Sequence, residues 1–301
     1  MNVSTRNRGF VAILLSAIGY GSFGVWITII NEDLGSFQQI FFRYLLASLF
    51  VVAVLLFKKT AIKREVLFSK DTLLLGVVFP FGIIFYTLSI LFTKIALATF
   101  SFYMAAFTAS LIIGAFVFNE KLTKLKFISL MLAIIGLIMF SNPFSGNLLN
   151  WGVLLGLLAG LLDVVSNGFR KHLAERMDRI IIAAVPMAGG IVISGAFAMY
   201  FKQSLFFADK LTFPSISAAI ISGGLLVLFN YLLVIGFQYF DLNLGTIVLS
   251  SEILFASAFG WIFLNQRLTV NEIVGGLIVA TAVSMPEAAG YFRWRKREAP
   301  D

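Results

Sequence analysis

The sequence predicts an all-α integral membrane protein in which ten transmembrane helices form two inverted five-helix repeats. Hydrophobic residues make up 59% of the 301 residues and charged residues only 13%, whereas a soluble domain carries about 25% charge. The mean hydropathy is +0.95. The apolar residues are gathered into blocks of about 20, each long enough to cross roughly 30 Å of hydrocarbon. One short motif occurs twice, each time just before such a block.

The apolar blocks give the positions of the ten predicted helices. The first block is too long for the apolar core of a signal peptide, so we expect it to remain as a helix. The third and fourth blocks are separated only by a short stretch around Lys94. In chain order, the predicted spans cover residues 10–30, 37–57, 72–92, 95–117, 125–141, 151–170, 180–201, 215–239, 245–264 and 271–290.

The repeated motif divides the chain into two halves. Residues 119–123 read NEKLT, and residues 265–269, 146 positions later, read NQRLT. Many transporters are built from duplicated helix bundles, with the substrate site between the halves. Because five spans is an odd number, the second half must enter the membrane in the opposite orientation. We predict a first repeat at 1–142, a second at 147–290 and a basic cytoplasmic tail at 291–301.

The basic residues set the predicted orientation. With the N-terminus inside, 18 of the 23 Lys and Arg residues fall in cytoplasmic segments and four in external ones. Basic residues are enriched in the cytoplasmic loops of membrane proteins. We therefore expect a multi-pass protein of a bacterial plasma (inner) membrane with both termini in the cytoplasm. The net charge of +8 follows from this topology, so the expected partners are the lipid bilayer and a small-molecule substrate, and no nucleic acid.

Several functional classes lack the residues that they require. The chain has no Cys and a single His, His172, in a predicted cytoplasmic loop, so we expect no enzyme activity, no metal site and no cofactor. No P-loop sequence supports ATP-driven transport. Residues 19–24 have the spacing G-x-G-x-x-G, but a hydrophobic span provides no βαβ unit for a dinucleotide. Close packing or bending of the first helix is the better interpretation.

The order of these elements resembles that of EamA-type members of the drug/metabolite transporter superfamily. In that family each half ends in a small-residue helix, a Gly/Asn-Glu-x-Leu-type corner and a Gly-containing closing helix. The matching segments are Ala105–Ser110 before NEKLT, and SSEILFASAFGWIFLNQRLT at 250–269. The triplet Phe42-Arg43-Tyr44 is also similar to the family's Arg-Phe pattern. The resemblance covers residues 10–290.

Two features depart from the family pattern. The usual Pro of the fourth and ninth helices is absent, with Thr108 and Ile253 at the approximate positions, and the second corner has Gln266 where an acid is common. The resemblance implies export of amino acids or other small metabolites. Together with the polar residues below, it predicts a central cavity walled by the first, third, fourth, sixth, eighth and ninth helices.

Glu252 is the first candidate for a substrate-binding residue. It lies near the middle of the ninth span, where an acidic side chain costs about 2.5 to 3.5 kcal/mol unless it faces water or a partner. Helical spacing puts Leu249 and Glu252 on one face, and the 146-residue offset maps that face onto Thr99, Tyr103 and Ala106 in the fourth span. Glu252 either binds a substrate ammonium or a proton, or it is a structural acid that joins two helices.

Asp163 and Asn167 form a second polar stripe, in the sixth span. Gly160 lies on the same face, so the stripe is both small and polar. The stripe either forms a second wall of the cavity, or Asp163 partners the nearby Arg170 and Lys171 at the inner end of the helix.

Arg43 lies about six residues inside the outer end of the second span, which is roughly 9 Å deep at 1.5 Å per residue. That depth allows the side chain to snorkel to the lipid headgroups. The alternative is a gate at the outer mouth that pairs with a substrate carboxylate.

Aromatic residues make up 15% of the chain, and most of them must face lipid or pack between helices. The polar edges of Trp26, Tyr86, Tyr103 and Tyr231, with Asn230, require partners at mid-depth. They either line a cavity for an aromatic or cationic ligand or pack between helices.

Pro80 and Pro186 interrupt the third and seventh spans, because proline lacks a backbone donor and bends a helix. They act either as hinges for alternating access or as static kinks.

These observations predict a secondary transporter that works by alternating access, with amino acids, including aromatic ones, as the exported substrates and protons as a candidate coupling ion. The alternatives are import of quaternary ammonium or nucleotide-like metabolites, and a non-transporting membrane sensor or assembly subunit. The oligomeric state is not predicted by the sequence.

Overall fold

The computed structural model describes residues 3–58, 64–93, 95–143, 150–205, 211–265 and 267–298. The side chains after residue 286 are outside this description, and so are residues 299–301, Lys94 and Gln266. Of the predicted basic tail at 291–301, only the helical backbone of 291–298 is therefore described. The helices are α1 Val3–Gly21, α2 Phe23–Asn31, α3 Ser36–Lys58, α4 Arg64–Leu67, α5 Lys70–Phe92, α6 Ile95–Phe116, α7 Lys124–Ser141, α8 Trp151–Leu173, α9 Arg179–Tyr200, α10 Phe213–Tyr239, α11 Leu242–Leu249, α12 Glu252–Leu264 and α13 Val270–Glu298.

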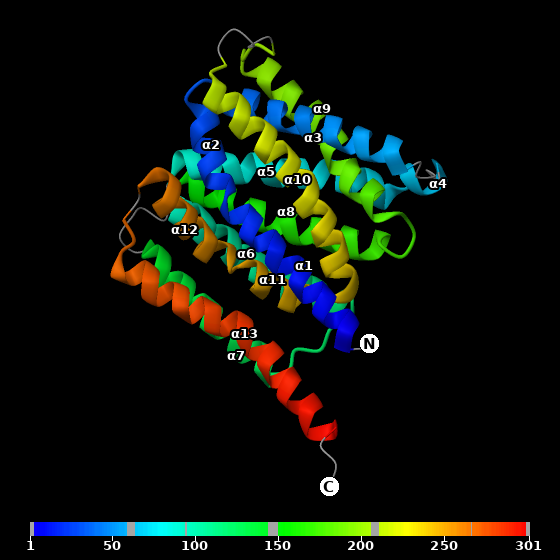
Figure 1. The fold of residues 1–301 in the computed structure, drawn as a ribbon, viewed down its shortest axis with the longest axis vertical. Helices are drawn as coiled ribbons and strands as arrows, with labels where there is room; N and C mark the ends of the chain where they lie inside the picture. Colours follow the sequence, from blue (N-terminus) through cyan, green and yellow to red (C-terminus); the bar gives the residue numbers. More distant parts are fainter. Residues whose placement is uncertain are drawn as a thin grey trace.

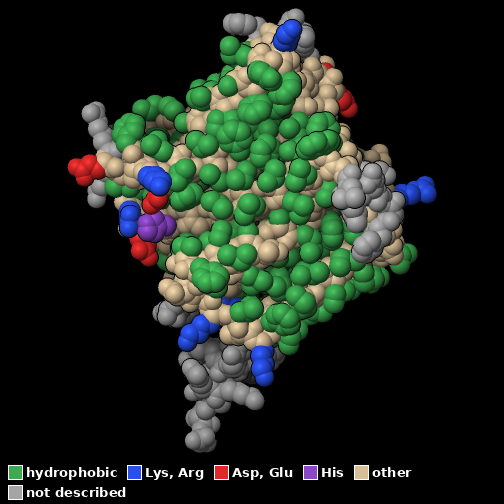
Figure 2. Space-filling model, turned by 180° about the vertical axis from the view of Figure 1, so that it is seen from behind, with side chains coloured by type: hydrophobic (Ala, Val, Ile, Leu, Met, Phe, Trp, Pro, Cys, Tyr) green, Lys and Arg blue, Asp and Glu red, His purple; other side chains and the backbone are tan. Residues whose placement is uncertain are grey.

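The predicted all-helical membrane fold is confirmed. Within the described residues, nine segments are long and apolar enough to cross a membrane, and Val270–Pro286 adds a shorter apolar helix. Large apolar side chains such as Phe57 and Phe116 are 88% and 84% exposed, as lipid-facing residues should be. Figure 2 shows hydrophobic side chains over the middle of one face, with the charged side chains gathered toward its margins.

The repeated motif folds into the same corner in both halves. Asn119 and Asn265 both have φ of 52°, a left-handed conformation that Asn adopts more readily than most residues and that ends the helix before it. Four residues later, Thr123 accepts a hydrogen bond from the Lys126 amide, and Thr269 accepts one from the Glu272 amide. The sequence repeat is therefore a structural repeat of a helix stop followed by a capped helix start.

Helices from the two halves pack against each other in matching pairs (Figure 1). Helix α5 packs along α8, and its counterpart α10 packs along α1. The closing helices α7 and α13 lie side by side at the edge of the bundle, where Gly136 and Gly275 bring their backbones together. A Cβ atom on Gly136 would lie 2.8 Å from the Gly275 carbonyl oxygen, so the contact requires glycine.

The first and ninth predicted spans are each broken into two helices. The glycine pattern at 19–24 allowed a bend in the first span, whereas the break in the ninth was not predicted. The first breaks at Ser22, whose hydroxyl donates to the Gly19 carbonyl at 2.7 Å. The ninth breaks at Ser250 and Ser251, whose hydroxyls donate to the carbonyls three residues earlier, both at 2.7 Å. Each of these carbonyls also accepts a hydrogen bond from the amide of the same serine, so the hydroxyl adds a second bond to the tight turn at the break. The ninth break places Glu252 at the first residue of α12, where the helix dipole favours a carboxylate.

Candidate functional site

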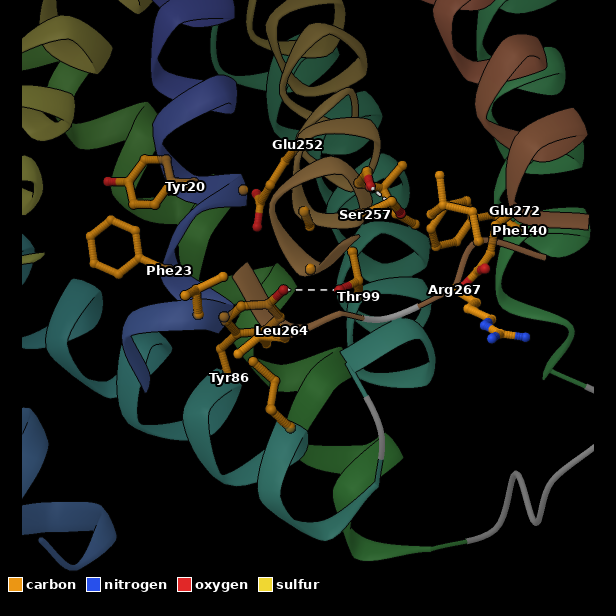
Figure 3. A pocket seen from close by; sticks show the side chains of 18 residues that line it. Tyr20, Phe23, Tyr86, Thr99, Phe140, Glu252, Ser257, Leu264, Arg267 and Glu272 are labelled. Carbon is orange, nitrogen blue, oxygen red and sulfur yellow. Dashed lines mark hydrogen bonds between the residues drawn. The ribbon is translucent and has the colours of Figure 1, made fainter. Parts of the chain in front are cut away.

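A cavity of about 340 Å³ lies between the two halves, and Glu252 is part of its wall. Figure 3 shows Glu252 pointing from α12 toward the space bordered by Tyr20, Tyr86 and Thr99. The wall also reaches Arg267 and Glu272, beyond the end of α12, on the side of the membrane predicted to be external. The lining residues are Tyr20, Gly21, Phe23, Gly24, Val25, Tyr86, Ile90, Thr99, Phe140, Glu252, Ile253, Ala256, Ser257, Gly260, Leu264, Arg267, Leu268 and Glu272. We call this space the outer cavity.

A smaller cavity of about 50 Å³ lies next to the outer cavity, and we call it the inner pocket. Tyr20, Tyr86 and Glu252 line both spaces, so these three side chains separate one from the other. The inner pocket also brings Asp163 from α8 to the same space as Glu252. Its lining residues are Tyr20, Phe79, Gly82, Ile83, Tyr86, Phe102, Tyr103, Ala159, Asp163, Leu233, Leu249 and Glu252.

The break in α1 makes room for the acidic site. Gly21 ends α1 against the start of α12, where a Cβ atom would lie 2.9 Å from the Glu252 carbonyl oxygen and 2.8 Å from the Ala256 amide nitrogen. Only a residue without a side chain fits between these backbones. The same close approach lets Tyr20 reach both cavities.

Glu252 is held by a tyrosine rather than by a basic residue. The Tyr103 hydroxyl lies 2.6 Å from Glu252 Oε2 and 2.8 Å from the Leu249 carbonyl oxygen. Within the described part of the chain, no Lys or Arg forms an ion pair with Glu252 or Asp163. A tyrosine hydroxyl carries one proton and cannot donate fully to two acceptors. Both contacts are satisfied when Glu252 carries a proton and donates to Tyr103, which then donates to Leu249.

Asp163 belongs to a chain of buried hydrogen bonds that runs through Arg170 and returns to the cavity wall at Tyr20. Asn167 Nδ2 donates to Asp163 Oδ2 at 2.8 Å, and Arg170 donates to Asn167 Oδ1 at 2.5 Å. Arg170 also donates to Asn230 Oδ1 at 2.6 Å, and Asn230 Nδ2 lies 3.3 Å from the Tyr20 hydroxyl. The two interpretations of Asp163 are thus compatible, because it lines the inner pocket and connects to Arg170 through Asn167.

Arg170 is fully buried within the membrane-spanning part of the bundle. Its guanidinium group lies 4.6 Å from the centre of the Phe79 ring, and its hydrogen bonds go to two neutral amides. Such a buried cation is stable only where ring faces and amide oxygens replace its water. The network therefore fixes α8, α10 and α1 relative to each other around the inner pocket.

Of the remaining predicted residues, Tyr86 and Thr99 lie in the site and are hydrogen-bonded to each other at 3.0 Å (Figure 3). Trp26 donates to Ser22 Oγ at 3.0 Å and is not among the lining residues of either cavity. Tyr231 lies outside both cavities as well, with the Lys58 ammonium group 5.6 Å from its ring centre. Asn230 lines neither cavity and is connected to the site only through its hydrogen bonds with Arg170 and Tyr20.

The interpretation of Arg43 as a snorkelling residue is wrong. The side chain is 3% exposed and its guanidinium carbon lies 5.9 Å from the centre of the Phe23 ring. Phe23 lines the outer cavity, whereas Arg43 does not. Depth along a helix could not reveal this, because the side chain turns toward the bundle instead of toward the membrane surface.

Pro80 and Pro186 lie inside continuous helices, α5 and α9 respectively. Both side chains are buried. Neither proline ends its helix, so their role as hinges stays a prediction.

Sequence reasoning missed a polar group at the opposite end of the bundle. Glu120 Oε1 accepts hydrogen bonds from the Leu242 amide and from Lys171 Nζ, both at 2.6 Å, and Glu120 Oε2 accepts one from the Asn243 amide at 3.1 Å. The first-half corner thereby caps α11 of the second half and pairs with α8. The occurrence of Glu120 in the repeated motif was a signal that could have found it.

A second ion pair lies beside Glu120. Lys126 Nζ is 2.6 Å from Asp241 Oδ2, which again joins the first-half corner to the start of α11. We call Glu120, Lys171, Lys126, Asp241 and the first residues of α11 the inner closure. It lies at the end of the bundle that the basic residues predict to be cytoplasmic, away from Arg267 and Glu272 at the mouth of the outer cavity.

Comparisons with known proteins agree with this architecture. The sequence pattern of the EamA-like transporter family matches residues 7–142 and 150–285. An uncharacterized transporter of Archaeoglobus fulgidus is 26% identical over 290 residues, which cover 91% of this chain and 94% of that protein. A solved crystal structure superposes with a TM-score of 0.76 at 14% identity, covering 95% of this chain and 98% of the other. With both halves matched, the chain belongs to the EamA-like transporter family and is a multi-pass membrane transporter.

Proposed function

We propose that the protein is a secondary transporter that exports small ammonium-bearing metabolites, with amino acids, including aromatic ones, as the first candidates. The observation that carries this proposal is the position of Glu252. Its carboxylate lies at the junction of the outer cavity and the inner pocket, without a basic partner among the described residues. An acid without a counter-ion at mid-membrane depth is costly unless a ligand or a proton neutralises it.

The cavity walls favour a substrate with an apolar or aromatic part. Tyr20, Phe23, Tyr86 and Phe140 line the outer cavity, and Glu252 is the acid at its deep end. Ring faces attract cations and also stack on aromatic groups. Arg267 and Glu272 give the mouth of the cavity one positive and one negative charge, which match the carboxylate and the ammonium group of an amino acid. A volume of about 340 Å³ is within the usual range for small-molecule sites.

The direction of export is the one implied by the family resemblance. An alternating-access carrier exposes one central site to each side in turn. With both termini in the cytoplasm, as the Lys and Arg distribution favours, the structure corresponds to a state open to the outside and closed at the inner closure. In that state an exporter would release substrate and take up a proton.

The hydrogen bonds of Tyr103 support Glu252 as the proton carrier. Its hydroxyl contacts two acceptors, and one of them must donate for both contacts to be full hydrogen bonds. A proton on Glu252 meets this requirement. Binding of a substrate ammonium would displace that proton, so one carboxylate could serve two ligands in turn.

Transport of quaternary ammonium compounds is the second candidate. Five aromatic rings (Tyr20, Phe79, Tyr86, Phe102 and Tyr103) and two carboxylates line the inner pocket, with no Lys or Arg among its lining residues. A cage of ring faces with an acid is the usual chemistry for a quaternary ammonium group. A nucleotide-like metabolite is disfavoured, because the inner pocket offers its phosphates no cation and Arg267 lies at the mouth of the outer cavity.

Counterflow in liposomes tests the proposal. Purified protein is reconstituted, the liposomes are preloaded with unlabelled amino acid or with unlabelled choline, and uptake of the matching labelled compound is followed with and without a proton gradient. Glu252→Gln should lose flux, whereas Glu175→Gln, which changes an exposed acid of the α8–α9 loop outside both cavities, should keep most of it.

The outcomes separate the candidate functions. Saturable amino-acid flux supports the first candidate, and choline flux alone supports the second. No flux of either from folded wild-type protein would contradict both and favour a membrane sensor or assembly subunit. Flux that survives Glu252→Gln unchanged would contradict the role of this carboxylate while leaving transport established.

A further inference from the structure

A groove of about 420 Å³ lies on the outside of the bundle, between the start of α1 and the end of α10. It is separate from the outer cavity and the inner pocket, with which it shares no lining residue. Figure 1 shows the N-terminal end of α1 beside the C-terminal end of α10, at the end of the bundle predicted to be cytoplasmic.

Small residues next to this groove bring the two helices together, although Gly9 and Gly236 do not line it themselves. A Cβ atom on Gly9 would lie 3.1 Å from the Gly236 carbonyl oxygen, and one on Gly236 would lie 2.4 Å from the Ile13 side chain. Ala12 is 5% exposed at the base of the groove. The larger lining side chains of α1, Val11 and Leu15, are 49% and 45% exposed, and Leu232 and Ile235 line the groove from α10. The result is an apolar furrow that runs toward the middle of the membrane.

Two arginines lie at the polar end of the furrow. Arg179, at the start of α9, donates to Gln238 Oε1 at 2.8 Å and to the Tyr239 hydroxyl at 2.7 Å. These bonds hold its guanidinium group over the Tyr239 ring, 5.5 Å from the ring centre. Arg8 lines the other side of the furrow and is exposed. Arg179 is therefore held in place by hydrogen bonds, whereas the exposed side chain of Arg8 can change its conformation.

The two arginines lack acidic partners within the described residues. No ion pair joins either of them to an Asp or Glu in that part of the chain. The nearest acid in sequence, Asp178, is used to cap α9 by accepting a hydrogen bond from the Ile180 amide at 2.9 Å. The positive charge at the groove is therefore not neutralised by the protein.

We propose that this groove binds one anionic phospholipid, with its headgroup phosphate between Arg8 and Arg179 and an acyl chain along Val11, Leu15 and Ile235. The charge of the arginines complements the phosphate, since a guanidinium group donates two parallel hydrogen bonds to its oxygens. The apolar furrow continues from the arginines in the direction that a lipid tail takes from its headgroup. A soluble anion would use only the arginines and leave the furrow unused, whereas a phospholipid uses both.

Native mass spectrometry of the full chain in detergent tests this site, with phosphatidylglycerol and phosphatidylcholine of identical acyl chains as probes. Wild-type protein should retain phosphatidylglycerol in preference to phosphatidylcholine. Arg8→Gln should weaken retention about fivefold, the effect of one basic residue near a lipid surface. Because Arg8 has no described hydrogen-bond partner, its removal leaves the fold intact. Arg176→Gln, an exposed arginine of the α8–α9 loop outside the groove, is the matched control and should retain lipid as the wild type does.

The acyl-chain contact is tested separately. Leu15→Asn should reduce retention, whereas Leu49→Asn, which replaces an exposed apolar residue of α3 outside the groove, should not. An excess of inorganic phosphate should not displace the lipid. Equal retention of the two lipids by wild type, undiminished retention by Arg8→Gln or displacement by phosphate alone would each overturn the proposal.

Discussion

The two ends of the bundle are built from the same repeated corner, yet among the described residues only the corner at the inner end forms hydrogen bonds with the other half. At the inner closure, Glu120 reaches from the first-half corner to the amides of α11 and to Lys171. At the outer corner, Glu272 Oε2 accepts hydrogen bonds from the amide and the hydroxyl of Thr269, in the same corner, at 2.7 and 2.9 Å. A duplicated motif thus serves as a cross-link at one end and as a local helix cap at the other.

A difference in sequence between the two corners accompanies this difference in structure. The position that holds Glu120 in the first corner holds Gln266 in the second. The Glu120 side chain is 5% exposed and its partner Lys171 is 20% exposed, so this ion pair is largely shielded from water. Breaking a buried pair by removing one partner typically costs about 3 to 5 kcal/mol. Such energies are large enough to decide which end of a carrier is open.

The largest expected effect comes from removing the cross-link. Glu120→Ala should favour opening of the inner end, because Lys171 and the first amides of α11 lose their partner. Since the chain contains no Cys, a single reporter cysteine at Ser110, which is 1% exposed on α6, can be labelled with a maleimide. We expect labelling about tenfold faster or more in Glu120→Ala.

The control for this experiment is Glu175→Ala, which removes an exposed acid of the α8–α9 loop. It should label as slowly as the parent. Equal labelling rates for Glu120→Ala and Glu175→Ala would show that the inner closure does not hold that end shut.

The second-largest effect is expected from a substitution of Glu252 in the outer cavity. Glu252→Gln keeps the shape of the side chain but cannot lose a proton, so substrate flux should fall at least tenfold and its dependence on pH should flatten. The measurement is counterflow at several pH values in liposomes. A folded variant whose flux keeps the wild-type pH dependence would remove Glu252 as the proton carrier.

A smaller effect is expected from the second ion pair of the inner closure. Lys126 and Asp241 are 12% and 43% exposed, so water screens this pair more than it screens Glu120 and Lys171. Partly exposed pairs contribute about 1 kcal/mol or less. Lys126→Gln should therefore speed labelling of the Ser110 cysteine by about fivefold at most. An effect as large as that of Glu120→Ala would mean that the two ion pairs act as one unit.

The smallest effect is expected at a tie on the outer surface. Hydrogen bonds from the Ser215 and Thr212 side chains and from the Thr212 amide lower the pKa of Asp33, in the α2–α3 loop. A lowered pKa in the folded state means that the stabilisation is present above the unfolded pKa and is lost as pH falls through the folded value. Asp33→Asn should thus lower the Tm slightly at neutral pH, and the difference should vanish in acid. A difference that grows on acidification would contradict this assignment.

Much of the fold could be predicted from the sequence. The apolar blocks gave the number and positions of the spans, and the repeated pentapeptide gave the corners at Asn119 and Asn265. Glu252 and Tyr103, chosen from helical spacing and the repeat offset, lie in hydrogen-bonding contact. The fold predictions succeeded because hydropathy and the repeated pattern can be read directly from the chain. The roles of Glu252 and Tyr103 in binding stay predictions.

Other features depended on which helices meet. Sequence spacing could not show that Asp163 connects to Arg170 through Asn167, or that Arg43 packs behind Phe23 instead of reaching the membrane surface. The break at Ser250 was missed, and the break at Ser22 was expected only as a possible bend, because serine within an apolar block is compatible with a continuous helix. A side chain's depth is set by its own helix, but its partner is set by the neighbouring one.

By itself, the sequence determined that the chain is a duplicated membrane protein and that one acid, Glu252, lies at mid-depth without a counter-ion on its own helix. Burial of apolar residues in lipid and the cost of a charge there enforce both features locally. The tertiary structure alone decided that Glu120 ties the halves together at one end while the cavity opens at the other. That choice depends on hydrogen bonds between residues about 120 positions apart, Glu120 with Leu242 and Asn243, which exist only after the two halves have packed.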